Sequence, residues 1–119
     1  MKNFKNEIAK FADYLENQKG YSNNTVDGYL RDISKFEEFC RSLKVDSPQL
    51  VTREIILEFL KLPTRTGEKP APAYRNRRLS VLKSFWAFLM REGTVTDDPT
   101  DKIEWSKTPV NEPDFITEK

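Results

Sequence analysis

One stretch of the sequence, residues 73–91, gathers positive charge in a way that suits contact with phosphate groups. It holds five basic residues and no acidic ones, whereas the whole chain has 20 basic and 19 acidic residues and a net charge of +1. The rest of the chain is therefore net negative. The basic residues are Arg75, Arg77, Arg78, Lys83 and Arg91. Cations concentrated in one place attract nucleic-acid phosphates more strongly than an evenly mixed surface does.

The same stretch has the apolar spacing of a helix with two chemically different sides. At about 100° per residue, Leu79, Leu82 and Trp86 fall together, and we expect them to face the core. Arg75 falls on that apolar side near the helix start, where its long side chain can lean outward. The other side carries donors suited to base edges and phosphates in a major groove: Asn76, Arg77, Ser80, Lys83 and Ser84. An ordinary solvated helix face is the alternative interpretation.

A second predicted helix shows a weaker version of this pattern. One polar stripe runs along it, opposite the apolar residues: Asn24, Gly28, Arg31 and Lys35. The start of this helix, from Ser22 to Thr25, offers free N–H groups that suit a phosphate. A glycine inside a helix costs about 1 kcal/mol relative to alanine, so Gly28 indicates close approach by another helix or by a phosphate backbone. The neighbouring acidic residues Asp27, Asp32 and Glu38 oppose binding to DNA.

The composition argues against a catalytic centre in this chain. There is no histidine, the four glycines are scattered, and Cys40 is the single cysteine. The usual general base, the commonest metal ligand and a glycine-rich phosphate loop are thus missing, and we predict no catalytic residues, cofactor or metal. The lone Cys40 fits a core thiol in a reducing cytoplasm, and no apolar run approaches the length that spans a membrane.

The elements that must hold these residues are predicted to be helices only. We expect a compact all-α bundle of four main helices, with no segment that alternates at the period of a strand. The predicted helices run from Phe4 to about Lys19, from Ser22 or Asn24 to about Leu43, from Thr52 to Leu60 and from Ala73 to Arg91. Residues 63–72, with three prolines and a glycine, read as a loop. Residues 1–99 are predicted to form the domain, and 100–119 a linker outside the core.

The order of several segments resembles a known family. These are Tyr21 to Thr25 with Tyr29, Asp32-Ile33, Phe36 and Phe39; then residues 77–86 and Phe88 to Gly93; then Asp98-Pro99, Trp105 to Lys107, Pro113 and Phe115 to Thr117. Together they are similar to the N-terminal domain of tyrosine recombinases of the phage integrase and Xer type. The resemblance covers nearly the whole chain, and the order and spacing of its motifs are more specific than any one of them.

That resemblance implies a SAM-like core-binding domain, which places two helices against the major groove of duplex DNA. The DNA-facing positions it implies are Ser22, Asn24, Thr25, Gly28, Arg31, Asn76, Arg77, Ser80, Lys83 and Ser84. The chain departs from the family at Tyr74 and Arg75, where threonine and an aliphatic residue are usual. The start of that helix therefore differs from the pattern of the family.

The resemblance also implies that the chain is a fragment of a larger enzyme. The family's catalytic residues belong to a domain that would begin near Pro113. The implied parent cleaves and rejoins DNA through a phosphotyrosyl intermediate and acts as an oligomer on DNA. The fragment would be a monomer whose partners are double-stranded DNA and the C-terminal catalytic domain. Two alternatives remain, a free-standing DNA-binding accessory factor of a mobile element and a helical module that binds an acidic protein.

Overall fold

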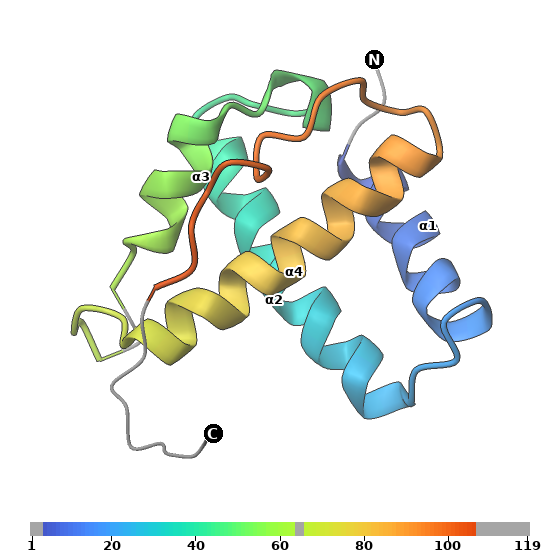
Figure 1. Cartoon of the computed structure of the whole chain (residues 1–119), viewed down its shortest axis with the longest axis horizontal. Coiled ribbons are helices and arrows are strands. Elements are labelled where there is room, and N and C mark those ends of the chain that lie inside the picture. Colours follow the sequence, from blue (N-terminus) through green and yellow to red (C-terminus); the bar gives the residue numbers. More distant parts are fainter. Residues whose placement is uncertain (1–3, 64–65, 107–119) are drawn as a thin grey trace, which may run out of the picture.

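The fold is built from helices, as the sequence predicts. The computed structural model describes residues 4–63 and 66–106. In that part of the chain the elements are α1 (Phe4–Asn17), α2 (Asn23–Ser42), the short 3₁₀ helix η1 (Pro48–Leu50), α3 (Arg53–Leu60) and α4 (Pro72–Arg91), with no strand (Figure 1). The all-α class and the four main helices are confirmed.

Local signals explain where these helices begin and end. Ser22 caps α2, because its hydroxyl accepts the Thr25 N–H at 3.3 Å, and Thr52 caps α3 through the Ile55 N–H at the same distance. Pro72 starts α4, where a missing N–H costs nothing. Gly93 follows α4 with φ at +76°, a backbone conformation that glycine adopts most readily.

Helix α4 is the central element, since it packs against each of α1, α2 and α3 (Figure 1). Leu79, Leu82 and Trp86 are fully buried, as their spacing predicts. Trp86 meets Phe36 of α2 edge-on, with ring centroids 5.8 Å apart. Phe11 of α1 meets Phe85 of α4 in the same way at 5.2 Å. These ring pairs fix α4 against α1 and α2.

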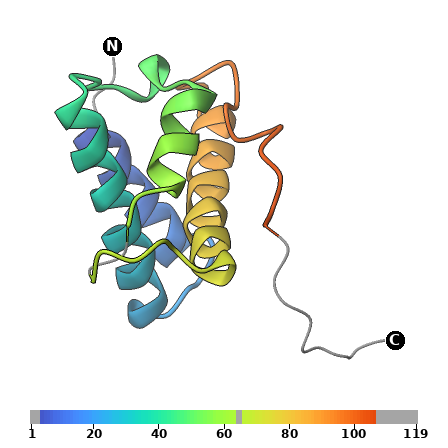
Figure 2. The ribbon, with the colours of Figure 1, turned by 90° about the vertical axis from the view of Figure 1, so that its left-hand side faces the viewer.

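The segment that follows α4 packs back along it. We call residues 100–106 the strap, and Figure 2 shows it on the side of α4 that faces away from α2. Thr100 is completely buried and Ile103 is 5% exposed. The prediction that the chain leaves the core after Pro99 is therefore wrong for the strap, because two isolated buried side chains in an aperiodic segment give no sequence pattern. Residues 107–119 of the predicted linker lie outside the described residues.

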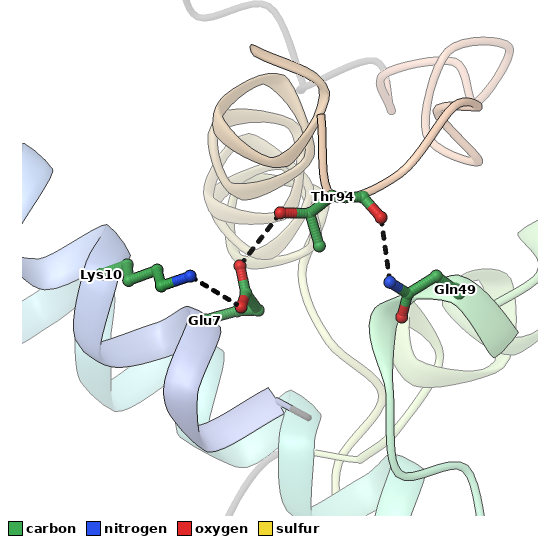
Figure 3. A network of polar contacts seen from close by, with 4 residues as sticks. All are labelled: Glu7, Lys10, Gln49 and Thr94. Atoms are coloured by element: carbon green, nitrogen blue, oxygen red, sulfur yellow. Dashed lines mark hydrogen bonds and ion pairs between the residues drawn. The ribbon is translucent and has the colours of Figure 1, made fainter. Parts of the chain in front are cut away.

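A polar network holds the turn from which the strap departs. Glu7 of α1 is buried, and its Oε1 accepts the Thr94 hydroxyl at 3.2 Å, while Lys10 Nζ lies 3.5 Å from Oε2 (Figure 3). Gln49 of η1 donates to the Thr94 carbonyl at 2.9 Å. The first turn after α4 is thus tied to both α1 and η1.

The single cysteine lies in the core, as predicted. Cys40 is buried in the core, and burial raises the pKa of its thiol from 9.0 to about 12, so little reactive thiolate exists at neutral pH. Among the described helices, none has the length and apolar character needed to cross a membrane.

Candidate nucleic-acid interface

An open hollow lies between the first half of α4 and the N-terminal half of α2. Its volume is about 320 Å³. The residues that line it come from the two polar stripes that the sequence analysis identified and from their neighbours on the same helices: Asn24, Thr25, Gly28, Tyr29, Asp32, Arg77, Ser80 and Val81. The fold therefore brings five predicted site residues together here, from two helices far apart in the sequence.

Arg77 is the cation of this hollow, and Asp32 fixes its position. The Arg77 Nε donates to Asp32 Oδ2 at 3.0 Å, with the Asp32 side chain 8% exposed and that of Arg77 54% exposed. One buried carboxylate thus orients an arginine whose remaining donors stay near solvent. The sequence indicated Asp32 as a charge that repels DNA, and it did not reveal the pairing with Arg77, because the two residues lie on different helices.

Gly28 lies directly beside that guanidinium. A Cβ placed on Gly28 would lie 3.8 Å from Arg77 Nη2, an ordinary contact, and no other described atom beyond its own helix comes within 4 Å. Of the two reasons considered for this glycine, close packing of another helix is therefore not observed. Among the described residues, only the side chain of Arg77 comes close to the position that a side chain at Gly28 would take.

The start of α2 borders the hollow, which Asn24 and Thr25 line. Ser22 and Thr25 are engaged in the cap, with their hydroxyl oxygens 3.0 Å apart. The backbone N–H groups of Asn23 and Asn24 have no hydrogen-bond partner among the described residues, as is usual for the first turn of a helix. Farther along α2, Arg31 and Lys35 are exposed and form no ion pair with any described residue.

A second hollow, of about 180 Å³, opens beside the later half of α4. Lys19 and Tyr21 line it from the α1–α2 connection, and Ser84 and Arg91 line it from α4. Ser84 therefore lies next to the first hollow rather than in it. Burial is the main cause that raises the pKa of the nearby Tyr29, and the Ser84 side chain acts to lower it.

The strap occupies the other edge of the exposed side of α4. Asn76 pairs with Ser106 through two hydrogen bonds of 2.8 Å, one from its amide group to the carbonyl and one from the Ser106 N–H to Asn76 Oδ1. Arg75 donates to the Glu104 carbonyl at 3.0 Å. Lys83 donates to the Thr100 carbonyl at 2.7 Å. Three predicted site residues therefore bind the strap, and Arg75 leans outward as expected.

Lys83 also contacts an aromatic ring of the strap. Its Nζ lies 5.7 Å from the centre of the Trp105 ring, which is 52% exposed. An ammonium over an indole ring gains a cation–π attraction in addition to its hydrogen bond to Thr100. The Lys83 side chain is partly buried in this position, so its charge is directed toward the strap.

Arg78 is directed toward the end of α3, unlike the other basic residues of α4. It is 7% exposed and donates to the carbonyls of Phe59 and Leu62 at 3.1 and 3.0 Å. These carbonyls lie at the end of α3 and just after it, where a helix leaves acceptors without partners. Its guanidinium also lies 4.5 Å from the centre of the Tyr74 ring. Arg78 therefore caps α3, and the five cations of α4 do not share one face.

No group of three or more potential metal-ligating side chains was found within residues 4–63 and 66–106. The donors that do converge are arginine, amide, hydroxyl and backbone N–H groups. Such donors recognise anions and base edges rather than metal ions.

Comparison with known proteins adds information that geometry alone does not. Residues 8–93 match the family described as phage integrase, N-terminal SAM-like domain. The chain is 32% identical to tyrosine recombinase XerC of Bacillus licheniformis over 120 residues, which cover 100% of this chain and 38% of that protein. It is 30% identical to tyrosine recombinase XerD of Staphylococcus epidermidis over 109 residues, covering 92% of this chain and 36% of the relative.

A third relative, tyrosine recombinase XerC of Leptospira interrogans, is 33% identical over 103 residues, which cover 86% of this chain and 32% of that protein. The chain thus spans roughly a third of the length of these curated relatives. No solved structure gives a significant match.

Proposed function

Because this chain belongs to the phage integrase N-terminal SAM-like domain family, we propose that it binds duplex DNA as the core-binding domain of a site-specific tyrosine recombinase. The whole parent would cleave and rejoin DNA, with its catalytic residues in a further domain. It would act in the cytoplasm as an oligomer on DNA, and this domain alone would be a monomer. The relatives bear the name tyrosine recombinase, and this chain corresponds to about a third of each.

The observation that carries the proposal is the hollow between α2 and α4. There Arg77 is oriented by Asp32 and stays more than half exposed, beside Ser80 and the uncovered first turn of α2. A fixed arginine loses little conformational entropy when it binds, and a helix start attracts phosphate. The hollow therefore combines an anion-binding backbone with a positioned cation.

We divide the predicted residues into those that would contact DNA and those that would support the fold around the contact. Asn24, Thr25, Gly28, Arg77 and Ser80 would meet DNA directly in the first hollow, with α4 against the major groove. Arg31 and Lys35 would reach flanking phosphates from the exposed stripe of α2, and Ser84 would contact DNA beside the hollow. Ser22 would act through the cap of α2, and Arg75, Asn76 and Lys83 would hold the strap. This division narrows the predicted site to the uncovered edge of α4 and the polar stripe of α2 beside it.

Amide-resolved titration tests this proposal. Duplex DNA of mixed sequence is added at low salt to the ¹⁵N-labelled chain, and the amide signals of residues 23–28 and 77–84 are followed. The expected result is a progressive shift of these signals, with those of η1 and α3 unmoved, and a loss of the shifts as salt is raised. Shifts confined to other regions, or no shift at all, would overturn it and favour a protein partner for the basic side of α4.

A further inference from the structure

We propose that Arg91 is a second DNA phosphate contact, placed at the opposite end of α4 from Arg77 so that the helix meets both strands bordering one major groove. This inference rests on the proposed DNA-binding function and extends it to a residue outside the site predicted from the sequence. It is based on the different contacts that the five basic side chains of α4 make. Arg75, Arg78 and Lys83 are used inside the fold, whereas the side chains of Arg77 and Arg91 remain available.

The two available arginines lie on one line along the helix. They are separated by 14 residues within α4, which is about 21 Å at about 1.5 Å per residue, and the rotation between them returns to within about 40° of the same direction. We call Arg77, Ser80, Ser84, Ala87 and Arg91 the open row. Its three middle members have small side chains, so another surface can approach the helix closely between the two arginines.

Arg91 is held in a way that leaves donors for a ligand. Its Nη1 donates to the Tyr14 hydroxyl at 3.2 Å, and its guanidinium carbon lies 5.5 Å from the centre of the Tyr14 ring. Arginine has five N–H donors, and this contact uses one. Tyr14 of α1 therefore acts on Arg91 as Asp32 of α2 acts on Arg77, since each fixes one arginine from a neighbouring helix.

The charge around Arg91 also favours an anion. The second hollow is lined by two cations, Lys19 and Arg91, and by no acidic residue. Asp13 and Glu92 line a separate hollow, which shares Tyr14 and Phe88 with the second hollow and also contains Lys10. The field in the second hollow is therefore positive on the side that continues the open row.

The spacing fits duplex DNA. The major groove of B-DNA is about 12 Å wide, which is less than the ~21 Å between the two arginine positions. With the small middle of the open row in the groove, the two guanidinium groups lie over the strands that border it and not over the bases within it. Both arginines then bind phosphate, and base preference depends on the smaller polar side chains between them and on α2.

Salt-dependent binding by single variants tests this arrangement. A fluorescein-labelled duplex of mixed sequence is titrated with the wild-type chain and with Arg91→Gln, Arg91→Lys, Arg77→Gln and Arg41→Gln between about 50 and 200 mM salt. Arg41 is the matched control, because its side chain is 58% exposed at the far end of α2 and pairs with Glu37. Thermal unfolding of each variant verifies that the fold is intact.

If Arg91 binds phosphate, Arg91→Gln makes the slope of log affinity against log salt less steep by about 0.9, which is about an eight-fold loss at 0.1 M salt. Arg77→Gln has an equal effect, whereas Arg91→Lys keeps the wild-type slope and Arg41→Gln changes nothing. An unchanged slope for Arg91→Gln together with a reduced slope for Arg77→Gln overturns the inference and leaves the proposed function standing. No binding by the wild-type chain overturns both.

Discussion

The two edges of the exposed side of α4 differ more in use than in composition. One edge carries Arg77, Ser80 and Ser84, and it faces open hollows next to α1 and α2. The other edge carries Asn76 and Lys83, whose polar groups are bound to main-chain atoms of the strap at 2.7–2.8 Å. Both edges have the residue types of a DNA-binding helix. They differ in what lies beside them, which is open hollows at one edge and the strap at the other.

This difference shows that charge on a helix is an incomplete guide to its ligand. A cation whose donors are already satisfied by carbonyls gains less from a phosphate, because it must first give up those bonds. A cation held by one neighbour, like Arg77, keeps free donors and a defined position. Four sets of substitutions test this difference between the edge of α4 that contacts the strap, the strap edge, and the edge that faces the hollows, the open edge.

The largest effect is expected for Arg78, which belongs to neither edge. Arg78→Met retains an apolar chain over Tyr74 but leaves the carbonyls of Phe59 and Leu62 without their donor. We expect the free energy of unfolding to fall by about 2–3 kcal/mol in urea denaturation, with the salt slope of DNA binding unchanged. Arg53→Met, at an exposed position of α3, is the control and should stay within about 0.5 kcal/mol. A large change in salt slope for Arg78→Met would contradict the capping role.

The next effect concerns the strap. Asn76→Ala removes both bonds to Ser106, and we expect a loss of about 1–2 kcal/mol in the free energy of unfolding, with faster hydrogen exchange at the Ser106 amide. DNA affinity should be unchanged. The matched variant on the open edge, Ser80→Ala, should do the reverse, with stability within about 0.5 kcal/mol and weaker DNA binding. The division between edges fails if both variants change DNA affinity equally.

A third pair of substitutions compares one cation from each edge. Lys83→Gln is expected to leave the salt slope of DNA binding unaltered, because the Lys83 ammonium is bound to the Thr100 carbonyl and lies over the Trp105 ring. Arg77→Gln is expected to reduce the slope by about 0.9. Fluorescence anisotropy across a salt series measures both. Equal reductions would mean that DNA displaces the strap and that α4 then presents both edges.

The smallest effect is expected at Gly28. Replacing this helical glycine with alanine should raise the free energy of unfolding by about 0.5–1 kcal/mol, since the added Cβ meets Arg77 Nη2 at an ordinary 3.8 Å. The same methyl group would project into the hollow and weaken DNA binding. Higher stability with unaltered DNA affinity would indicate that no phosphate approaches α2 at this point.

The core was predictable from the sequence because burial has a period. Leu79, Leu82 and Trp86 repeat at helical spacing, and all three are buried. The cap at Thr52 was predicted and Ser22 was one of two candidates for the cap of α2, since a cap is a local interaction between neighbours in the chain. The four-helix class followed from these local and periodic signals.

The sorting of the cations was not predictable, because it depends on contacts between distant segments. Arg78 meets the end of α3, and Lys83 meets the strap, which has no periodic pattern of its own. Any residue type can supply a main-chain carbonyl, so the sequence does not reveal which residue accepts such a hydrogen bond. The Arg77–Asp32 pair joins residues 45 positions apart, which a helical wheel drawn for one helix cannot relate.

The way the strap is attached has one further consequence. Asn76 binds the carbonyl and the N–H of Ser106, and Arg75 binds the carbonyl of Glu104. Almost any residue would supply these main-chain atoms. Substitutions at positions 104 and 106 can therefore alter the outward chemistry of the strap while its path along α4 stays the same. The path of the strap along α4 thus depends on these α4 side chains and on the buried Thr100 and Ile103, rather than on which residues stand at positions 104 and 106.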